Sequence, residues 1–235
     1  LPEGEVKEIS VSVGDEFLYE GLDTQRVVDI SQYEKDLTIA HYALATTEHI
    51  DRAMEIASRD ESGWAAMSYE QRHEILSFAA RELRKARGDL IGVAAAEVGK
   101  LFGETDTEVS EAIDFAEFYP LAMERFADRK NLQMKGKGVG VVIPPWNFPI
   151  AIPAGGVLAS LVAGNNTVLK PSPQATYCGW VICQALWKAG VPRKALQFLP
   201  CRNDPEASHL AMHPKVEYVI FTGSTKTALN MLKKR

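Results

Sequence analysis

Residues 139–149 read VGVVIPPWNFP, a short apolar run rich in β-branched residues that stops at a pair of prolines. Three further β-rich runs follow it along the chain, separated by stretches with the apolar spacing of helices. The expected strands are residues 139–143, 167–170, 197–200 and 218–222, and the expected helices are residues 153–163, 176–190 and 206–213. This alternation predicts βαβ units and an α/β fold, in which helices cover both faces of a parallel sheet and ligands bind at the carboxyl ends of its strands.

The preceding part of the chain has a different sequence pattern, in which amphipathic helices predominate. Alternating stretches near its start, such as EISVSV at residues 8–13, predict short strands. Helices are expected from Thr47, from Ser68, over residues 89–99 and from Thr105. Ser68 and Gln71 have the spacing of a capping box, and Pro120 is expected to disturb the last of these helices.

The composition is that of an ordinary globular protein, with 46% hydrophobic and 24% charged residues among 235 and a formal net charge of -5. Such a chain lacks the clustered Lys and Arg that nucleic acid or an anionic membrane requires. Residues 138–169 carry no charge, but prolines interrupt them, so we expect a buried strand and core helix there and no membrane span. Three cysteines without CxxC spacing predict neither disulfides nor a zinc site, and they favour a reducing, cytoplasmic location.

The familiar nucleotide-binding motifs are missing. The glycines in GKGVG at residues 136–140 precede a strand and do not have GxGxxG spacing, and GSTKT at residues 223–227 lacks the upstream glycine of a P-loop. What remains is FTGST at residues 221–225, placed between a strand and an expected helix. The start of a helix there offers free N–H groups, a positive dipole end and a hydroxyl to a pyrophosphate, although Ser224 is equally suited to a plain N-cap.

Two other strand ends carry unusual residues. Asn147 lies among prolines and aromatic residues, where a rigid turn can hold its amide toward a developing oxyanion; the alternative is an amide that satisfies its own turn. Lys170 and Ser172 follow the next strand, where the lysine either reaches the ribose hydroxyls of a nucleotide or extends to solvent. Because these strand ends meet at one edge of the predicted sheet, that edge is the candidate ligand site.

The segments VGVVIPPWNFP, NNTVLKPSP and VIFTGST resemble, in order and spacing, the cofactor-domain motifs of the aldehyde dehydrogenase superfamily, and the resemblance extends from about Glu48 onward. It implies an aldehyde dehydrogenase-like fold with a helical N-terminal part and a truncated Rossmann-like domain that binds NAD, or NADP, without GxGxxG. It also implies that Asn147 stabilises the oxyanion of a thiohemiacetal. The cofactor-binding residues that it implies are Ile143, Pro145, Trp146, Lys170, Ser172, Gly223 and Ser224.

Within the superfamily, AAAEVGKLFGETDTEVSEAIDFAEFYPLAMERFA at residues 94–127 is similar to a helical segment of the 1-pyrroline-5-carboxylate dehydrogenases of proline catabolism. The alternative is an unrelated amphipathic helix of similar pattern. The resemblance implies a small aldehyde, L-glutamate γ-semialdehyde, as substrate, and a homo-oligomer or a fusion to a proline dehydrogenase domain. Residues 129–137 resemble the start of the family's oligomerisation hairpin, so the predicted division is residues 1–138 and 139–235.

Two positions depart from the family's pattern. Pro173 stands where many members have an acidic residue for the adenosine ribose, which leaves the choice between NAD and NADP open. Cys201 stands where many have glycine, and it precedes the FTGST strand, so it is not the expected nucleophile; Cys178 and Cys183 are expected to be buried and inert.

The family's catalytic cysteine and glutamate normally follow FTGST and are not present, so we expect an N-terminal fragment that is inactive alone. Two alternatives stay open: a non-catalytic module that binds a nucleotide or a partner, and a phosphate-binding domain unrelated to dehydrogenases. A phosphate-binding domain of that kind would depend on Ser224 for ligand binding and not on Trp146.

Overall fold

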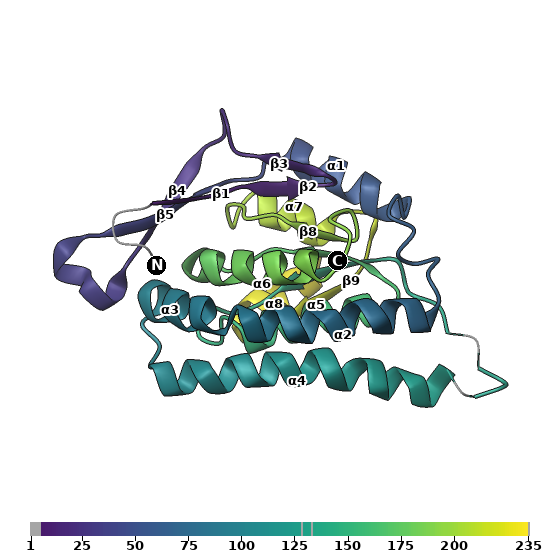
Figure 1. Cartoon of the computed structure of the whole chain (residues 1–235). Coiled ribbons are helices and arrows are strands. Elements are labelled where there is room, and N and C mark those ends of the chain that lie inside the picture. The colour runs from purple at the N-terminus through teal and green to yellow at the C-terminus, as the bar shows by residue number, and fades with distance from the viewer. Residues whose placement is uncertain (1–5, 128, 133, 235) are drawn as a thin grey trace.

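A computed structural model of the chain describes residues 6–127, 129–132 and 134–234 and contains a six-stranded sheet with helices on both faces (Figure 1). The strand order is β3-β2-β8-β7-β6-β9, in which β8, β7, β6 and β9 are parallel and β2 and β3 are antiparallel additions at one edge. A separate three-stranded sheet has the order β1-β5-β4 and lies to the left in Figure 1.

The strands are β1 (Lys7–Ile9), β2 (Val11–Val13), β3 (Glu16–Leu18), β4 (Thr24–Val28), β5 (Thr38–Ala43), β6 (Val139–Ile143), β7 (Asn166–Leu169), β8 (Leu196–Phe198) and β9 (Val216–Phe221). The α-helices are α1 (Thr47–Ser58), α2 (Tyr69–Lys85), α3 (Arg87–Val98), α4 (Phe102–Ala127), α5 (Ala151–Val162), α6 (Thr176–Lys188), α7 (Glu206–Met212) and α8 (Thr225–Lys234). Two short 3-10 helices, η1 (Ile30–Lys35) and η2 (Pro173–Ala175), complete the described elements.

The path of the chain through the parallel strands places a crevice between β6 and β9. From β6 the chain steps outward to β7 and β8, and it then crosses back to add β9 on the opposite side of β6. Ligands of open α/β sheets bind at the carboxyl ends of the strands on either side of such a reversal. The topology therefore predicts that a ligand binds beside the residues that follow Ile143 and Phe221.

The two faces of the sheet are buried by different helices. Along β6, Val139, Val141 and Ile143 belong to the hydrophobic cluster that contains residues of α1 and α7, whereas Val142 belongs to the cluster formed with α2 to α6. This alternation follows from the two-residue period of a strand. In Figure 1, α1 lies near the top, α6 crosses the middle of the view, and α2 and then α4 lie at the bottom.

Helix α5 fits between the sheet and α4 because two adjacent glycines let it approach both. A Cβ atom on Gly156 would lie 2.8 Å from the side chain of Val142 on β6, and one on Gly155 would lie 2.9 Å from the Phe115 ring on α4. Glycine is therefore required by close packing at both positions. Both glycines lie in the first half of α5, which follows the loop at residues 144–149.

The predicted alternation of strands and helices is confirmed, and the capping box of Ser68 and Gln71 is present. The predicted disturbance at Pro120 is wrong, because α4 begins at Phe102 and continues through Pro120 to Ala127. Packing of α4 along α2 holds this region, where the Tyr69 hydroxyl donates to the Pro120 carbonyl (2.8 Å). Tertiary contacts here outweigh the hydrogen bond that a proline removes.

Over the described residues, every helix is too short or too polar to cross a lipid bilayer. The predicted hairpin start, residues 129–137, lies partly outside the described residues and stays a prediction, as does the division at residue 138.

Candidate functional site

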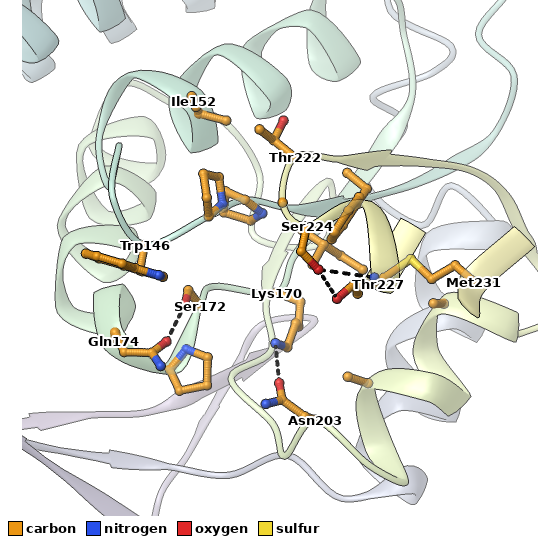
Figure 2. Close-up of a pocket in the computed structure, with 18 of the residues that line it drawn as sticks. Trp146, Ile152, Lys170, Ser172, Gln174, Asn203, Thr222, Ser224, Thr227 and Met231 are labelled. Carbon is orange, nitrogen blue, oxygen red and sulfur yellow. Dashed lines mark hydrogen bonds between the residues drawn. The ribbon is translucent and has the colours of Figure 1, made fainter. Parts of the chain in front are cut away.

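A cleft of about 890 Å³ opens at the carboxyl ends of the parallel strands (Figure 2). Its lining comes from the segments that follow β6, β7, β8 and β9 and from helices α7 and α8. All eight residues selected from the sequence line it: Ile143, Pro145, Trp146, Asn147, Lys170, Ser172, Gly223 and Ser224. The structure thus brings together residues up to 81 positions apart, while their individual roles stay predictions.

Helix α8 begins at this cleft, directly after β9. The Ser224 hydroxyl accepts a hydrogen bond from the Thr227 N–H (3.2 Å) and lies 2.9 Å from the Thr227 hydroxyl, so Ser224 is an N-cap. One capping bond leaves other N–H groups of the first turn for a ligand. A Cβ atom on Gly223 would lie 2.5 Å from the Phe221 ring, so a side chain at this position would displace that ring from the cleft.

The helices that follow β6 and β7 begin differently, because buried carboxylates cap them. Glu108 on α4 accepts hydrogen bonds from the N–H groups of Ile150 (3.0 Å) and Ala151 (3.1 Å) at the start of α5. Glu97 on α3 accepts from those of Tyr177 (2.8 Å) and Cys178 (2.9 Å) at the start of α6. Protein side chains thus occupy both helix starts.

This occupancy explains why the chain has no GxGxxG motif. In the usual dinucleotide fold, a glycine-rich turn leads the pyrophosphate to the helix after the first strand. That position corresponds to the start of α5, which Glu108 fills. Three helices, α5, α6 and α8, follow β6, β7 and β9. Among these three, α8 is the helix whose first N–H groups are not capped by a buried carboxylate and can bind an anionic ligand in the cleft.

Lys170 is the principal charged group inside the cleft. Its side chain is only 4% exposed, so the alternative in which it extends to solvent is wrong. The amine donates one long hydrogen bond to the Asn203 side-chain oxygen (3.4 Å), and no ion pair is found for it within the described part of the chain. Burial lowers the pKa of this amine. Figure 2 shows the amine directed toward Asn203 across the cleft.

A second recess, of about 530 Å³, lies against the loop that carries Asn147. Trp146, Asn147 and Phe148 line both this recess and the larger cleft. The remaining lining comes from the end of α3 and from α4, and it includes Lys100, Glu104, Glu108 and Glu111. The Asn147 loop therefore lies between a nucleotide-sized cleft and a smaller, acid-rich recess.

Several residues of the site were not selected from the sequence. Asn203 follows β8 and pairs with Lys170, and its place after a strand is the same sequence signal that Lys170 carries. Gln174, which follows the same strand end as Lys170, accepts a hydrogen bond from the Ser172 hydroxyl at its side-chain oxygen (2.6 Å). Lys100 and Glu108 carry no such signal, because in the sequence Lys100, just after a helix, and Glu108, on an amphipathic helix, look like ordinary surface charges.

The three cysteines are buried and lie at no more than 3% exposure. Burial raises the pKa of Cys178 and of Cys183, and it raises the pKa of Cys201 to about 11. A nucleophilic thiol needs the opposite, an exposed group with a lowered pKa. The prediction of buried thiols at Cys178 and Cys183 is confirmed.

We therefore expect the thiols of the folded chain to react with Ellman's reagent at pH 7.5 about a hundredfold or more slowly than free cysteine, because little thiolate forms. The absorbance change at 412 nm measures the rate, and the urea-unfolded chain should react fully within the same period. A thiol that reacts at the rate of free cysteine in the folded chain would contradict this assignment.

A parallel sheet with this strand order, whose reversal point carries a cleft and an open helix start, defines a Rossmann-like α/β fold. Residues 21–235 match the aldehyde dehydrogenase family, and the chain belongs to that family. The resemblance and the fold class predicted from the sequence are confirmed.

The similar proteins include 1-pyrroline-5-carboxylate dehydrogenase of Geobacillus sp. (strain WCH70), which is 31% identical over 89% of this chain and 43% of its own length. The crystal structure of 1-pyrroline-5-carboxylate dehydrogenase from Thermus with bound NAD is 27% identical, with a TM-score of 0.89 over 97% of this chain and 46% of that one. Proline utilization A from Bdellovibrio bacteriovorus is 31% identical, with a TM-score of 0.89 over 97% of this chain and 24% of that one. The chain spans less than half the length of each.

Proposed function

We propose that the whole protein oxidises an aldehyde to a carboxylic acid with NAD as hydride acceptor, and that this chain supplies the cofactor cleft and an oxyanion-binding amide. The observation that carries the proposal is the position of Asn147 between the two cavities. An amide placed there meets the cofactor on one side and the aldehyde on the other, which is where charge develops during oxidation.

The cleft suits a dinucleotide on chemical grounds. The buried Lys170 amine has a single long hydrogen bond, so ribose hydroxyls would satisfy its remaining donors. The start of α8 at Gly223 and Ser224 suits the pyrophosphate, and Ile143, Pro145 and Trp146 provide apolar walls. NADP stays an alternative, because Pro173 places no carboxylate against a 2′-phosphate at this part of the cleft.

Held by Lys170, Gly223 and Ser224, NAD would supply the hydride acceptor for the adduct between the aldehyde and a cysteine thiolate. The Asn147 amide donates a hydrogen bond to the oxygen that becomes negative in that adduct. We place the thiolate outside this chain, because burial raises the pKa of all three of its thiols. The family resemblance places the glutamate that activates water outside it as well. By itself the chain is proposed to bind nucleotide without turnover.

We propose L-glutamate γ-semialdehyde as the substrate and proline catabolism as the setting. The names of the similar proteins support this choice. The acid-rich recess beside Asn147 supports it as well, because the substrate carries an ammonium group and Glu104 and Glu111 line that recess. A homo-oligomer, or a fusion to a proline dehydrogenase domain, is proposed as the assembly and is tested by light scattering on the full-length protein.

The test is NADH formation by the full-length protein with L-glutamate γ-semialdehyde, propanal and benzaldehyde, followed at 340 nm. The proposal expects the semialdehyde to give the highest kcat/KM. Turnover of another aldehyde but not of the semialdehyde would overturn the proposed substrate assignment. Turnover of none of the three would overturn the proposal that the protein is an aldehyde-oxidising enzyme. Calorimetric titration of the 235-residue chain with NAD and with NADP tests the binding function separately, and failure to bind either would overturn it.

Replacement of Lys170 by methionine is expected to raise the dissociation constant for NAD by about 10- to 100-fold, since hydrogen bonds to a charged group each contribute about 1.5–3 kcal/mol. Methionine keeps most of the volume, so the cleft should retain its shape. Calorimetry on the chain measures the change, and Lys188→Met on the exposed end of α6 is the matched control. An unchanged dissociation constant would remove Lys170 from the cofactor site.

A further inference from the structure

Lys100 is held at the point where α3 ends and the second recess begins. Gly99 ends α3 in the left-handed region (φ 69°), and its N–H donates to the Ala95 carbonyl (3.1 Å). A residue with a side chain would be strained in that conformation. The turn takes Lys100 off the helix axis and leaves its side chain only 13% exposed.

The Lys100 ammonium connects the helical layer to the loop that carries Asn147. Its Nζ donates a hydrogen bond to the backbone carbonyl of Asn147 (3.1 Å) and lies 4.2 Å from the centre of the Phe148 ring. The same ammonium forms an ion pair with Glu108, whose side chain is 3% exposed. Desolvation of this kind strengthens both the ion pair and the charged hydrogen bond.

Glu108 holds the other end of the same loop. One carboxylate oxygen pairs with Lys100, and the second accepts the N–H groups of Ile150 and Ala151, where α5 begins. The loop is therefore fixed at Asn147 by the lysine and three residues later by the glutamate. Pro149 lies between these two points and stiffens the backbone.

We propose that Lys100 and Glu108 are positioning residues that hold the Asn147 backbone so that its side-chain amide meets the oxyanion. The inference rests on the proposed role of Asn147. Oxyanion donors act in the transition state only when their direction is fixed beforehand, so a loosened carbonyl at Asn147 should slow the chemical step while leaving cofactor binding intact.

The experiment uses the full-length protein, with NAD and whichever of L-glutamate γ-semialdehyde, propanal and benzaldehyde the parent turns over fastest. Lys100→Met removes the ammonium and keeps the volume. We expect kcat to fall about 10- to 100-fold, which corresponds to the loss of one charged hydrogen bond, with the dissociation constant for NAD unchanged within twofold. Lys85→Met, which removes an exposed lysine of a Lys–Glu pair on α2, is the matched control and should keep the parent rate.

A double-mutant cycle with Asn147→Ala separates positioning from general support of the fold. If Lys100 acts through Asn147, Lys100→Met should change the residual rate of the Asn147→Ala protein by less than about twofold, because residues that act as a unit are not additive. Should Lys100→Met leave Glu108 unpaired and prevent folding, the variant with Lys100→Met and Glu108→Gln removes both charges and carries the same test.

Three results would overturn the inference. The first is a Lys100→Met protein with the parent kcat, and the second is full additivity in the cycle. The third is a parallel loss of kcat, NAD affinity and thermal stability, which would make Lys100 a support of the fold alone. If Asn147→Ala itself keeps the parent rate, both the proposed role of Asn147 and the positioning role of Lys100 and Glu108 are wrong. If Asn147→Ala is slow and Lys100→Met is not, the inference alone fails.

Discussion

Replacement of Asn147 by alanine is expected to lower the kcat of the full-length protein by about 10²- to 10³-fold, the usual loss when one oxyanion donor is removed. The dissociation constant for NAD should stay within about twofold, because the donor acts on charge that develops in the transition state. Asn147 is exposed to the two cavities rather than packed in the core, so truncation should disturb the fold little. Steady-state NADH formation and calorimetric NAD binding measure the two quantities.

Two further variants make this result specific. Asn147→Asp keeps the shape of the side chain and replaces the N–H₂ donor by an acceptor, so it should lose as much rate as the alanine variant. Asn230→Ala removes an amide on α8 that lines the larger cleft but not the recess, and it should keep kcat within a few-fold. An Asn147→Ala protein with parent kcat would show that the oxyanion is stabilised elsewhere.

The strands of the parallel sheet were predictable because their sequence pattern is local. Residues 139–143 are β-branched and apolar apart from one glycine, prolines follow them, and β6 has those limits in the structure. The start of α2 was predictable for a similar reason, since the capping box of Ser68 and Gln71 needs only four consecutive residues. The path of α4 through Pro120 was not predictable, because contacts with α2 decide it and α2 is distant in sequence.

The cleft was predictable to the extent that strand ends define it. Lys170, Ser172 and Gly223 each follow a strand of the parallel sheet, and strand ends of such a sheet meet at one edge. The residues that cap the helices were not predictable, because their partners are remote. Glu108 lies 42 residues before Ile150, and Glu97 lies 80 residues before Tyr177. Nothing in an amphipathic helix marks which of its acidic residues will be buried.

These two carboxylates have the same capping geometry but different electrostatic surroundings. Glu108 has the Lys100 ammonium as a partner, which offsets the cost of burying its charge. Glu97 is 6% exposed and is hydrogen-bonded by N–H groups and by the Cys178 side chain, while the neighbouring Cys178 and Tyr42 offer it no positive charge. Burial therefore raises the pKa of Glu97 to about 7, although the hydrogen bonds from Tyr177 and Cys178 lower it. The charge on Glu97 is a net cost to the folded state.

The stability of the chain should for this reason fall as the pH rises from about 4.5 to about 7. Below pH 4.5, the ordinary pKa of a glutamate, the side chain is protonated in both states; between 4.5 and 7 the unfolded chain loses the proton and the folded chain keeps it. A pKa difference of this size corresponds to about 3 kcal/mol of unfolding free energy, all of it lost above pH 7. Glu97→Gln carries no charge and should not show this loss.

The measurement is urea unfolding of the parent chain and of Glu97→Gln between pH 4.5 and pH 8.5. The difference between their unfolding free energies should shift by about 3 kcal/mol in favour of glutamine across that range, while other titrating groups cancel. Glutamine retains one acceptor for the start of α6, so the helix should still form, and any constant offset between the two proteins is immaterial. Glu117→Gln, at an exposed position on α4, serves as the control for the loss of one carboxylate. Parallel curves for the parent and Glu97→Gln would mean that the N–H groups of α6 offset the cost of burying the Glu97 charge, as the Lys100 ammonium does for Glu108.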